Sequence, residues 1–184
     1  RRAQAGPRQH LVHAGLDLGE FRLDPALEVG ARDPRAHVHV AVLDLAAISK
    51  FRNAGQVCVS PTRFYVHESI YEKFAQGFAA RAKSWPVGNG LEAGIKMGPL
   101  AHPRRRPAVS ALIDEAIARG ARKLAGGEAL PGKGYFYAPT ILADVPDSAR
   151  IMNEEPFGPV AVLQPFREFD EVVKQANRLP FGLA

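Results

Sequence analysis

The chain contains little of the residue types that define several protein classes. Its single cysteine excludes an internal disulfide framework and fits a reducing compartment, so we expect a cytoplasmic protein. No apolar run is long enough to cross a bilayer, and no charged segment followed by an apolar stretch opens the chain. We therefore expect neither a membrane partner nor a signal peptide.

A basic patch with interleaved aromatic residues is also missing, although the formal net charge is +5. The positive charge is concentrated in the first third of the chain and in the run Arg104-Arg105-Arg106. Net charge alone would allow a nucleic-acid-binding domain, but a run of three arginines is more often a solvated helix face. We therefore expect no nucleic-acid partner. His37 and His39 could share one strand face, but no Cys or carboxylate cluster completes a tetrahedral site, so we expect no metal.

What is present is ordinary for a globular domain. The 184 residues suffice for one domain with a hydrophobic core, and 46% of them are hydrophobic and 23% charged. Short β-prone segments alternate with helical patterns, which predicts an α/β fold with a mainly parallel sheet and flanking helices. The expected strands cover 38–43, 64–66, 123–125, 135–137, 140–142 and 160–163. The expected helices cover 45–53, 69 to the Trp85-Pro86 pair, Pro103 to Gly120, and 166–177.

Local patterns also predict helix starts and buried faces. Ser69 and Glu72 have the spacing of a capping box, Pro103 can open the following helix, and Pro107 fits that helix only if it begins late. The positions expected to face the core recur at helical spacing: Ile70, Phe74, Phe78 and Ala82; then Val109, Leu112, Ile113, Ala116 and Ile117; then Phe169, Val172, Val173 and Ala176.

The only cysteine lies in the segment Asn53-Ala54-Gly55-Gln56-Val57-Cys58-Val59-Ser60-Pro61. A lone thiol in a Gly-containing loop after a helical stretch is placed like a nucleophile, and a thiolate attacks the electrophilic carbon of an aldehyde well. The resulting oxyanion needs hydrogen-bond donors, which the backbone N–H groups of such a loop can supply. The alternative is that Cys58 is a small buried hydrophobe.

A second segment, Asn153-Glu154-Glu155-Pro156-Phe157-Gly158-Pro159-Val160, follows further along the chain. It places a carboxylate and an aromatic ring beside a Gly-Pro turn. The alternative is that Glu155 is a solvated surface residue and Phe157 a core residue.

In this order and spacing, the two segments resemble the aldehyde dehydrogenase superfamily, and the resemblance is continuous from Ser49 to Ala184. It implies an incomplete catalytic-domain-like α/β fold and the oxidation of an aldehyde to the carboxylic acid with NAD or NADP. Cys58 would be the nucleophile, forming a thiohemiacetal and then a thioester. Glu155 would bind the nicotinamide ribose, and Phe157 would line the nicotinamide side of the pocket. The continuation Val59–Arg63 is similar to bacterial succinate-semialdehyde dehydrogenases.

The residues before Ser49 resemble the family less. The segment Leu27–Pro34 is loosely similar to the family's general-base segment, which makes Glu28 the candidate base, although its spacing to Cys58 is a few residues short and a surface Glu is the alternative. We therefore divide the chain into an atypical segment, 1–48, and a partial catalytic domain, 49–184. The atypical segment is either frame-disrupted or a remnant of the junction to a cofactor domain.

The resemblance covers less than the family's full subunit, so we expect a piece of a larger enzyme whose full-length form is a homo-oligomer. The residues that would hold the adenosine half of the cofactor, and those that would decide between NAD and NADP, have no counterpart here. The alternative function is therefore that of a catalytically inactive, truncated family member, acting at most as a binding or thiol-bearing module.

Overall fold

The computed structural model describes residues 34–180. In chain order the helices and strands are α1 (Pro34–Phe51), the 3-10 helix η2 (Arg52–Gly55), β1 (Arg63–His67), η3 (Glu68–Ile70), α2 (Tyr71–Lys83), α3 (Arg105–Ala118), β2 (Arg122–Ala125), β3 (Thr140–Ala143), η4 (Arg150–Met152), β4 (Val160–Phe166) and α4 (Phe169–Ala176).

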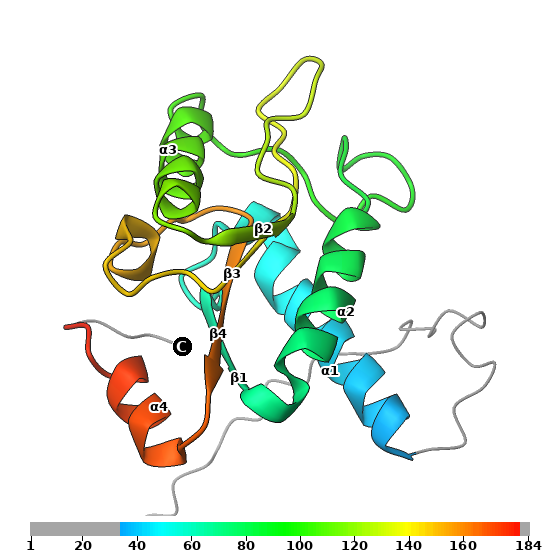
Figure 1. Cartoon of the computed structure of the whole chain (residues 1–184). Helices are drawn as coiled ribbons and strands as arrows, with labels where there is room; N and C mark the ends of the chain where they lie inside the picture. The colour runs from blue at the N-terminus through cyan, green and yellow to red at the C-terminus, as the bar shows by residue number, and fades with distance from the viewer. Residues whose placement is uncertain (1–33, 181–184) are drawn as a thin grey trace, which may run out of the picture.

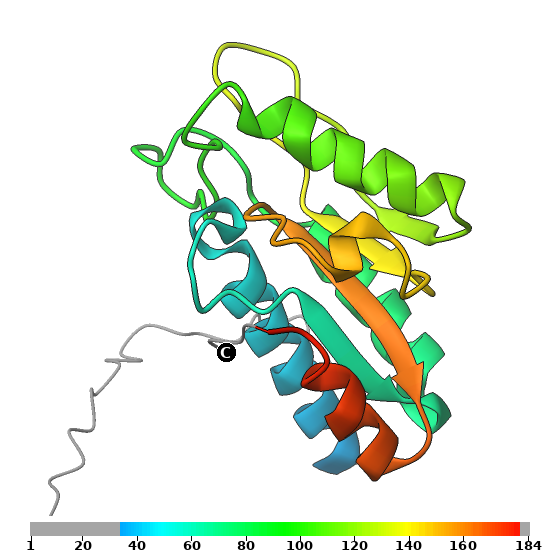
Figure 2. The ribbon, with the colours of Figure 1, turned by 90° about the vertical axis from the view of Figure 1, so that its left-hand side faces the viewer.

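The four strands form one sheet in the order β1-β4-β3-β2 (Figure 1). β1 pairs with β4 and β3 with β4 in parallel, whereas β2 pairs with β3 in the antiparallel sense. Helices α1 and α2 lie side by side on one face of the sheet, and α3 and α4 lie on the other (Figures 1 and 2). The predicted α/β fold with a mainly parallel sheet is therefore confirmed.

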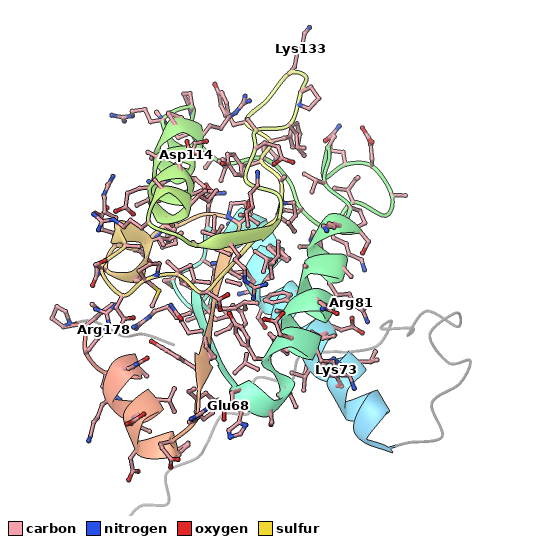
Figure 3. All side chains as sticks on the ribbon, viewed as in Figure 1. Glu68, Lys73, Arg81, Asp114, Lys133 and Arg178 are labelled. Carbon is pink, nitrogen blue, oxygen red and sulfur yellow. The ribbon has the colours of Figure 1, made fainter. Side chains whose placement is uncertain are left out.

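The core lies where both sheet faces are covered. β3 is buried along its whole length, and so are residues 160–163 of β4, as their continuous apolar run predicts. The α1–α2 layer adds Phe51, which packs against Phe78 with ring centroids 5.9 Å apart. On the outside of this layer, Arg81 of α2 forms an ion pair with Asp44 of α1 at 2.5 Å (Figure 3).

The predicted strand at 135–137 is wrong, because these residues lie between β2 and β3 and only Tyr137 forms an isolated bridge, to Ala129. The predicted strand at 38–43 is also wrong, because these residues belong to α1. Their alternating apolar residues imitate a strand, but Leu43, Ala47 and Phe51 follow one another at helical spacing and are all buried. Packing of this stripe against α2 decides the local structure. The predicted helix at 45–53 is the second half of the same element, and α1 runs across the proposed boundary between 1–48 and 49–184.

Several side chains expected in the core lie at the surface. Ile70, Ile117, Phe169, Val173 and Ala176 are exposed, Phe169 to 73%. The other members of their stripes, such as Phe74, Phe78 and Val109, are buried as predicted. The pattern assigns each helix face correctly but overestimates its width, since only the centre of each face meets the sheet.

The predicted helix starts have a mixed outcome. The helix after Ser69 begins at Tyr71, and no side chain caps it, so the capping box is wrong. The Ser69 Oγ instead lies 2.8 Å from His67 Nδ1. α3 does begin late, at Arg105, which places Pro107 in its first turn, where a missing N–H costs nothing.

The loops that lead into β1 and β4 meet at one end of the sheet. Gly55 adopts a positive φ of 68°, and a Cβ atom added there would lie 2.1 Å from the carbonyl oxygen of Gly158. Only glycine allows this approach, both because of its left-handed backbone and because a methyl group has no room. The contact joins the segment before Cys58 to the segment after Glu155.

We predict that Gly55→Ala lowers the free energy of unfolding by roughly 2–5 kcal/mol, the combined cost of a left-handed alanine and of overpacking. The matched control is Gly90→Ala, where a Cβ atom meets no heavy atom within 4 Å. It should change stability by less than about 0.5 kcal/mol. Urea unfolding followed by circular dichroism measures both variants, and equal stabilities would contradict the close approach.

Candidate functional site

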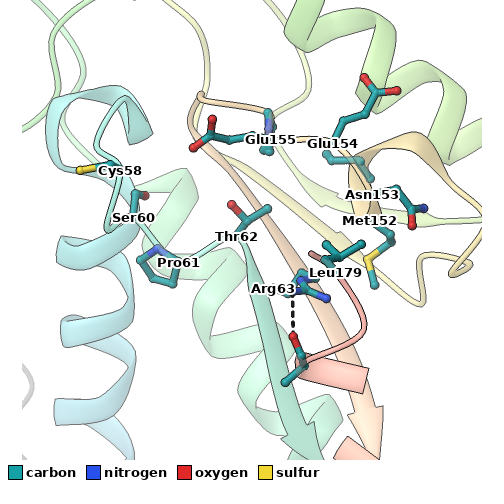
Figure 4. A pocket seen from close by; sticks show the side chains of 13 residues that line it. Cys58, Ser60, Pro61, Thr62, Arg63, Met152, Asn153, Glu154, Glu155 and Leu179 are labelled. Carbon is teal, nitrogen blue, oxygen red and sulfur yellow. Dashed lines mark hydrogen bonds between the residues drawn. The ribbon is translucent and has the colours of Figure 1, made fainter. Parts of the chain in front are cut away.

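A pocket of about 660 Å³ opens where the two loops meet (Figure 4). Its size falls in the range of small-molecule sites. It brings together the two signature segments, which lie far apart in the sequence. Its lining residues come from the cysteine loop and the start of β1, from the segment around Glu155, and from the end of α4: Cys58, Ser60, Pro61, Thr62, Arg63, Ile151, Met152, Asn153, Glu154, Glu155, Pro156, Ala176 and Leu179.

Strand pairing explains why the segments meet. The cysteine loop runs into β1, and the Glu155 segment runs into β4. These strands are parallel neighbours in which Arg63 is paired with Val162. The amino ends of neighbouring parallel strands lie at the same sheet edge. The residues just before both strands must therefore lie beside each other.

Cys58 is exposed on a loop that local contacts hold. Backbone bonds from Gln56 N to Asn53 O (3.0 Å) and from Ser60 N to Val57 O (2.9 Å) form two consecutive turns around it. The Ser60 hydroxyl donates to the carbonyl oxygen of Lys50 at 3.2 Å, which ties the loop back to α1. The thiol is accessible, and its backbone is fixed.

The backbone N–H of Cys58 donates no hydrogen bond within residues 34–180. An N–H group without a protein partner, next to an accessible thiol, is available to a negatively charged oxygen that forms on a carbon bonded to sulfur. Such an oxygen would accept the hydrogen bond at the point where charge develops.

Glu155 lies exposed in the same pocket and forms no ion pair within the described part of the chain. Its neighbour Glu154 is instead paired with Arg150 at 2.7 Å. In the view of Figure 4, the sulfur of Cys58 is directed away from Glu155. Thiol and carboxylate thus face different parts of the pocket, as two groups that contact different molecules would.

Phe157 is half-buried and is not among the residues that line the pocket. Its φ angle is +39°, a left-handed conformation that is uncommon outside glycine. The strained backbone lies between Glu155 and the Gly158 carbonyl that contacts Gly55. Glu28, the candidate base, lies outside the described residues.

Lys50, which sequence reasoning missed, lies at the base of the cysteine loop. Its side chain is only 1% exposed. Burial lowers the pKa of this amine to about 7, and the Glu155 carboxylate offsets part of that effect. The sequence does contain a signal for this buried amine. Lys50 continues the helical spacing of the apolar residues Leu43 and Ala47, a position where lysine is rarely found.

Arg63 is a second residue that the sequence did not single out. Its guanidinium donates to the carbonyl oxygens of Gln175 (3.4 Å) and Ala176 (3.2 Å) at the end of α4, and the second bond is drawn in Figure 4. This arginine forms one wall of the pocket by fixing α4 against β1. No motif indicates such a role, since the contact joins distant parts of the chain.

Residues 34–180 contain no group of three or more His, Cys, Asp or Glu side chains that could hold a metal ion. Within the same residues, no helix is both long and apolar enough to cross a membrane.

The chain is similar in sequence to known proteins. Residues 27–184 match the model of the aldehyde dehydrogenase family. The chain is 46% identical over 176 residues to the 4-(hydroxymethyl)benzenesulfonate dehydrogenase of Comamonas testosteroni, with 96% of this chain and 35% of that protein covered. It is 40% identical over 163 residues to the NADP-dependent succinate-semialdehyde dehydrogenase of Escherichia coli (strain K12), with 86% and 34% covered.

A solved structure of an E. coli NADP-dependent enzyme superposes with a TM-score of 0.76 at 40% identity, covering 79% of this chain and 30% of that one. The chain therefore spans about a third of the length of the curated relatives that it matches. The family match begins at residue 27, before the proposed boundary at 48/49, and the division at that boundary stays a prediction.

We predict that Cys58 reacts with Ellman's reagent in the folded chain. Because this is the only cysteine and it is exposed, one thiol per chain should titrate without denaturant, and Cys58→Ser should give none. Absorbance of the released thiolate measures the reaction. A thiol that reacts only after urea is added would contradict the exposed position.

We predict that stability rises with pH above neutrality because of Lys50. The folded chain loses the Lys50 proton near pH 7, whereas the unfolded chain keeps it until the ordinary lysine pKa. The unfolded state therefore binds more protons in between, and the free energy of unfolding increases by at most about 1.4 kcal/mol per pH unit. Lys50→Met should stabilise the chain at pH 7 and flatten this rise.

Urea unfolding at pH 7, 8 and 9 (roughly the lower half of this window) checks the effect. Lys83→Met, at an exposed position in the last turn of α2, is the matched control and should leave the rise unchanged. The same pH dependence in wild type and Lys50→Met would show that Lys50 is not the group responsible.

Proposed function

The chain belongs to the aldehyde dehydrogenase family, and on that premise we propose that it carries the thiol half of an NAD(P)-dependent oxidation of an aldehyde to a carboxylic acid. The observation that carries the proposal is that Cys58 and Glu155, from distant parts of the chain, line the same pocket. The proposal concerns the whole protein, since the chain spans about a third of its relatives.

Cys58 acts as the nucleophile. The sulfur lone pair forms a C–S bond to the aldehyde carbon, and the carbonyl π electrons move to the oxygen, which gives a thiohemiacetal. The backbone N–H of Cys58, which has no partner among residues 34–180, donates to that oxygen and stabilises its charge. Exposure of the thiol admits the aldehyde, and the fixed turns around it hold the sulfur in one place.

Glu155 and Phe157 are the residues proposed to hold the nicotinamide half of the cofactor. Glu155 fits this role because its carboxylate is exposed in the pocket and free of ion pairs within residues 34–180, so that it can accept from two ribose hydroxyls. NAD(P)⁺, when bound, accepts a hydride from the carbon attached to sulfur. Whether the cofactor is NAD or NADP depends on residues without a counterpart in this chain.

Water then cleaves the thioester, releasing the carboxylic acid and restoring the thiol. Glu28 is the proposed base that takes the proton from this water. The balanced reaction consumes one aldehyde, one water and one oxidised cofactor. A reduced thiol is needed throughout, which agrees with our proposal that the protein acts in the cytoplasm.

The proposed substrate class is an aldehyde with an anionic group remote from the reacting carbon. One relative is named for a benzenesulfonate and another for succinate semialdehyde, and both compounds carry a negative charge. Arg52 is exposed in η2, just before the cysteine loop, and forms no ion pair within the described residues. Its guanidinium can bind a carboxylate or a sulfonate through two parallel hydrogen bonds.

The second candidate function is that of an inactive, thiol-bearing binding module. It is favoured by the spacing of Glu28 to Cys58, which is a few residues shorter than that of the family's general base. The full-length protein is proposed to be a homo-oligomer in either case.

The first step can be tested without cofactor, because an aldehyde bonded to Cys58 protects the thiol from iodoacetamide. Succinate semialdehyde should protect at a concentration about tenfold lower than butanal, a neutral aldehyde with the same number of carbons. Arg52→Gln should remove this preference, whereas Arg104→Gln, an exposed arginine at the start of α3, should keep it. Equal protection by both aldehydes in wild type would rule out the anionic substrate class.

The second step is measured as NAD(P)H absorbance with each aldehyde. Wild-type protein should form reduced cofactor, and Cys58→Ser should form none. Protection of the thiol without cofactor reduction would favour the binding module. Cofactor reduction that survives in Cys58→Ser would show that Cys58 is not the nucleophile.

A further inference from the structure

Arg105, the first residue of α3, connects that helix to the turn after Glu155. Its guanidinium Nη2 donates to the carbonyl oxygen of Pro156 and, at 3.5 Å, to that of Phe157. The side chain is partly buried, and its Nε has no hydrogen-bond partner among residues 34–180. The guanidinium is thus partly buried and donates to two carbonyls of one turn.

That turn has few other backbone contacts. Within the described residues, Arg105 is the only hydrogen-bond donor to the carbonyl oxygens of Pro156 and Phe157. The same two carbonyls flank the left-handed backbone of Phe157, with its φ of +39°. A strained conformation persists only where its surroundings enforce it. The guanidinium is the polar group placed to do so.

The segment that leads into α3 also contacts the cysteine loop. The backbone N–H of Ala101 donates to Gln56 Oε1 at 2.9 Å. Gln56 lies between Gly55 and Cys58, so residues 101–105 touch both signature loops. The neighbouring arginines do not share this position, since Arg104 is exposed and Arg106 donates to the carbonyl oxygen of Gly134 at 3.2 Å.

We propose that Arg105 is a positioning residue that fixes the backbone turn carrying Glu155 and Phe157, so that Glu155 keeps one orientation toward the pocket and Phe157 keeps one backbone conformation beside it. The consequence for cofactor binding rests on the proposed function, whereas the ordering of the turn does not. A charge-assisted donor suits this task because it holds two carbonyls more firmly than a neutral one would.

Hydrogen exchange of the purified chain tests the ordering without cofactor. In Arg105→Met, the amides of Glu154 and Val160, which donate hydrogen bonds on either side of the turn, should exchange about tenfold faster than in wild type. The amides of residues 141–143 and 161–163 in the sheet should be unchanged, which separates a local loosening from general destabilisation. Arg104→Met is the matched control and should match wild type, and Arg105→Lys should recover part of the protection, because its ammonium can still donate to one carbonyl. Unchanged exchange at these two amides in Arg105→Met would overturn the proposal.

Kinetics test the consequence in protein that reduces cofactor. Arg105→Met should raise KM for NAD(P)⁺ about tenfold while kcat changes less than about threefold, because the loss falls on cofactor binding rather than on attack by Cys58. An unchanged KM together with faster exchange would refute the consequence for the cofactor. If exchange responds as expected but wild-type protein reduces no cofactor, the positioning role of Arg105 stands and the proposed function fails.

Discussion

The parallel pairing of β1 with β4 is the constraint on which the site depends. Each strand is preceded by one signature loop, and the pairing of Arg63 with Val162 fixes how far each loop projects at the sheet edge. A register shift by one residue would move the loops and turn every strand side chain to the opposite face. The close approach of Gly55 to the Gly158 carbonyl then locks the two loops together. Chemistry at the pocket is thus specified by backbone geometry that involves neither thiol nor carboxylate.

Local signals were sufficient for much of the fold and for the two signature segments. The buried run of β4 and the loop around Cys58 are encoded by adjacent residues, and the sequence predicts them. The strand predicted at 38–43 was wrong because alternation is judged from neighbouring residues alone. The stripe from Leu43 to Phe51 is buried only because it packs against α2, which comes later in the chain. The prediction that Phe169 is buried was wrong for a different reason. Its helix is amphipathic as predicted, but only Val172 at the centre of the apolar face is buried.

Contacts that hold the site from a distance were not predictable in the same way. Nothing in the run Arg104-Arg105-Arg106 distinguishes its middle residue, and the expectation of a solvated face holds for Arg104. The distinction arises because α3 begins at Arg105 and lies over the Glu155 turn. Lys50, like Arg105, was not singled out from the sequence. Burial of its amine in an apolar stripe costs free energy, and buried titratable groups of this kind are concentrated at functional sites. Near neutral pH both protonation states of Lys50 are populated beneath the cysteine loop.

The pairing of β1 with β4 also bears on how the site is assembled. The two strands flank α2, α3, β2 and β3 in the chain, so their contact closes a long loop whose entropy must be overcome before the pairing contributes any stability. Contacts of this kind form late during folding and slow it. A partly folded chain therefore displays its thiol on the end of α1 before the carboxylate of Glu155 arrives beside it. Because Cys58 is exposed in the folded chain as well, the pairing adds the Glu155 side of the pocket but does not shield the thiol, which stays accessible to oxidants and electrophiles before and after folding.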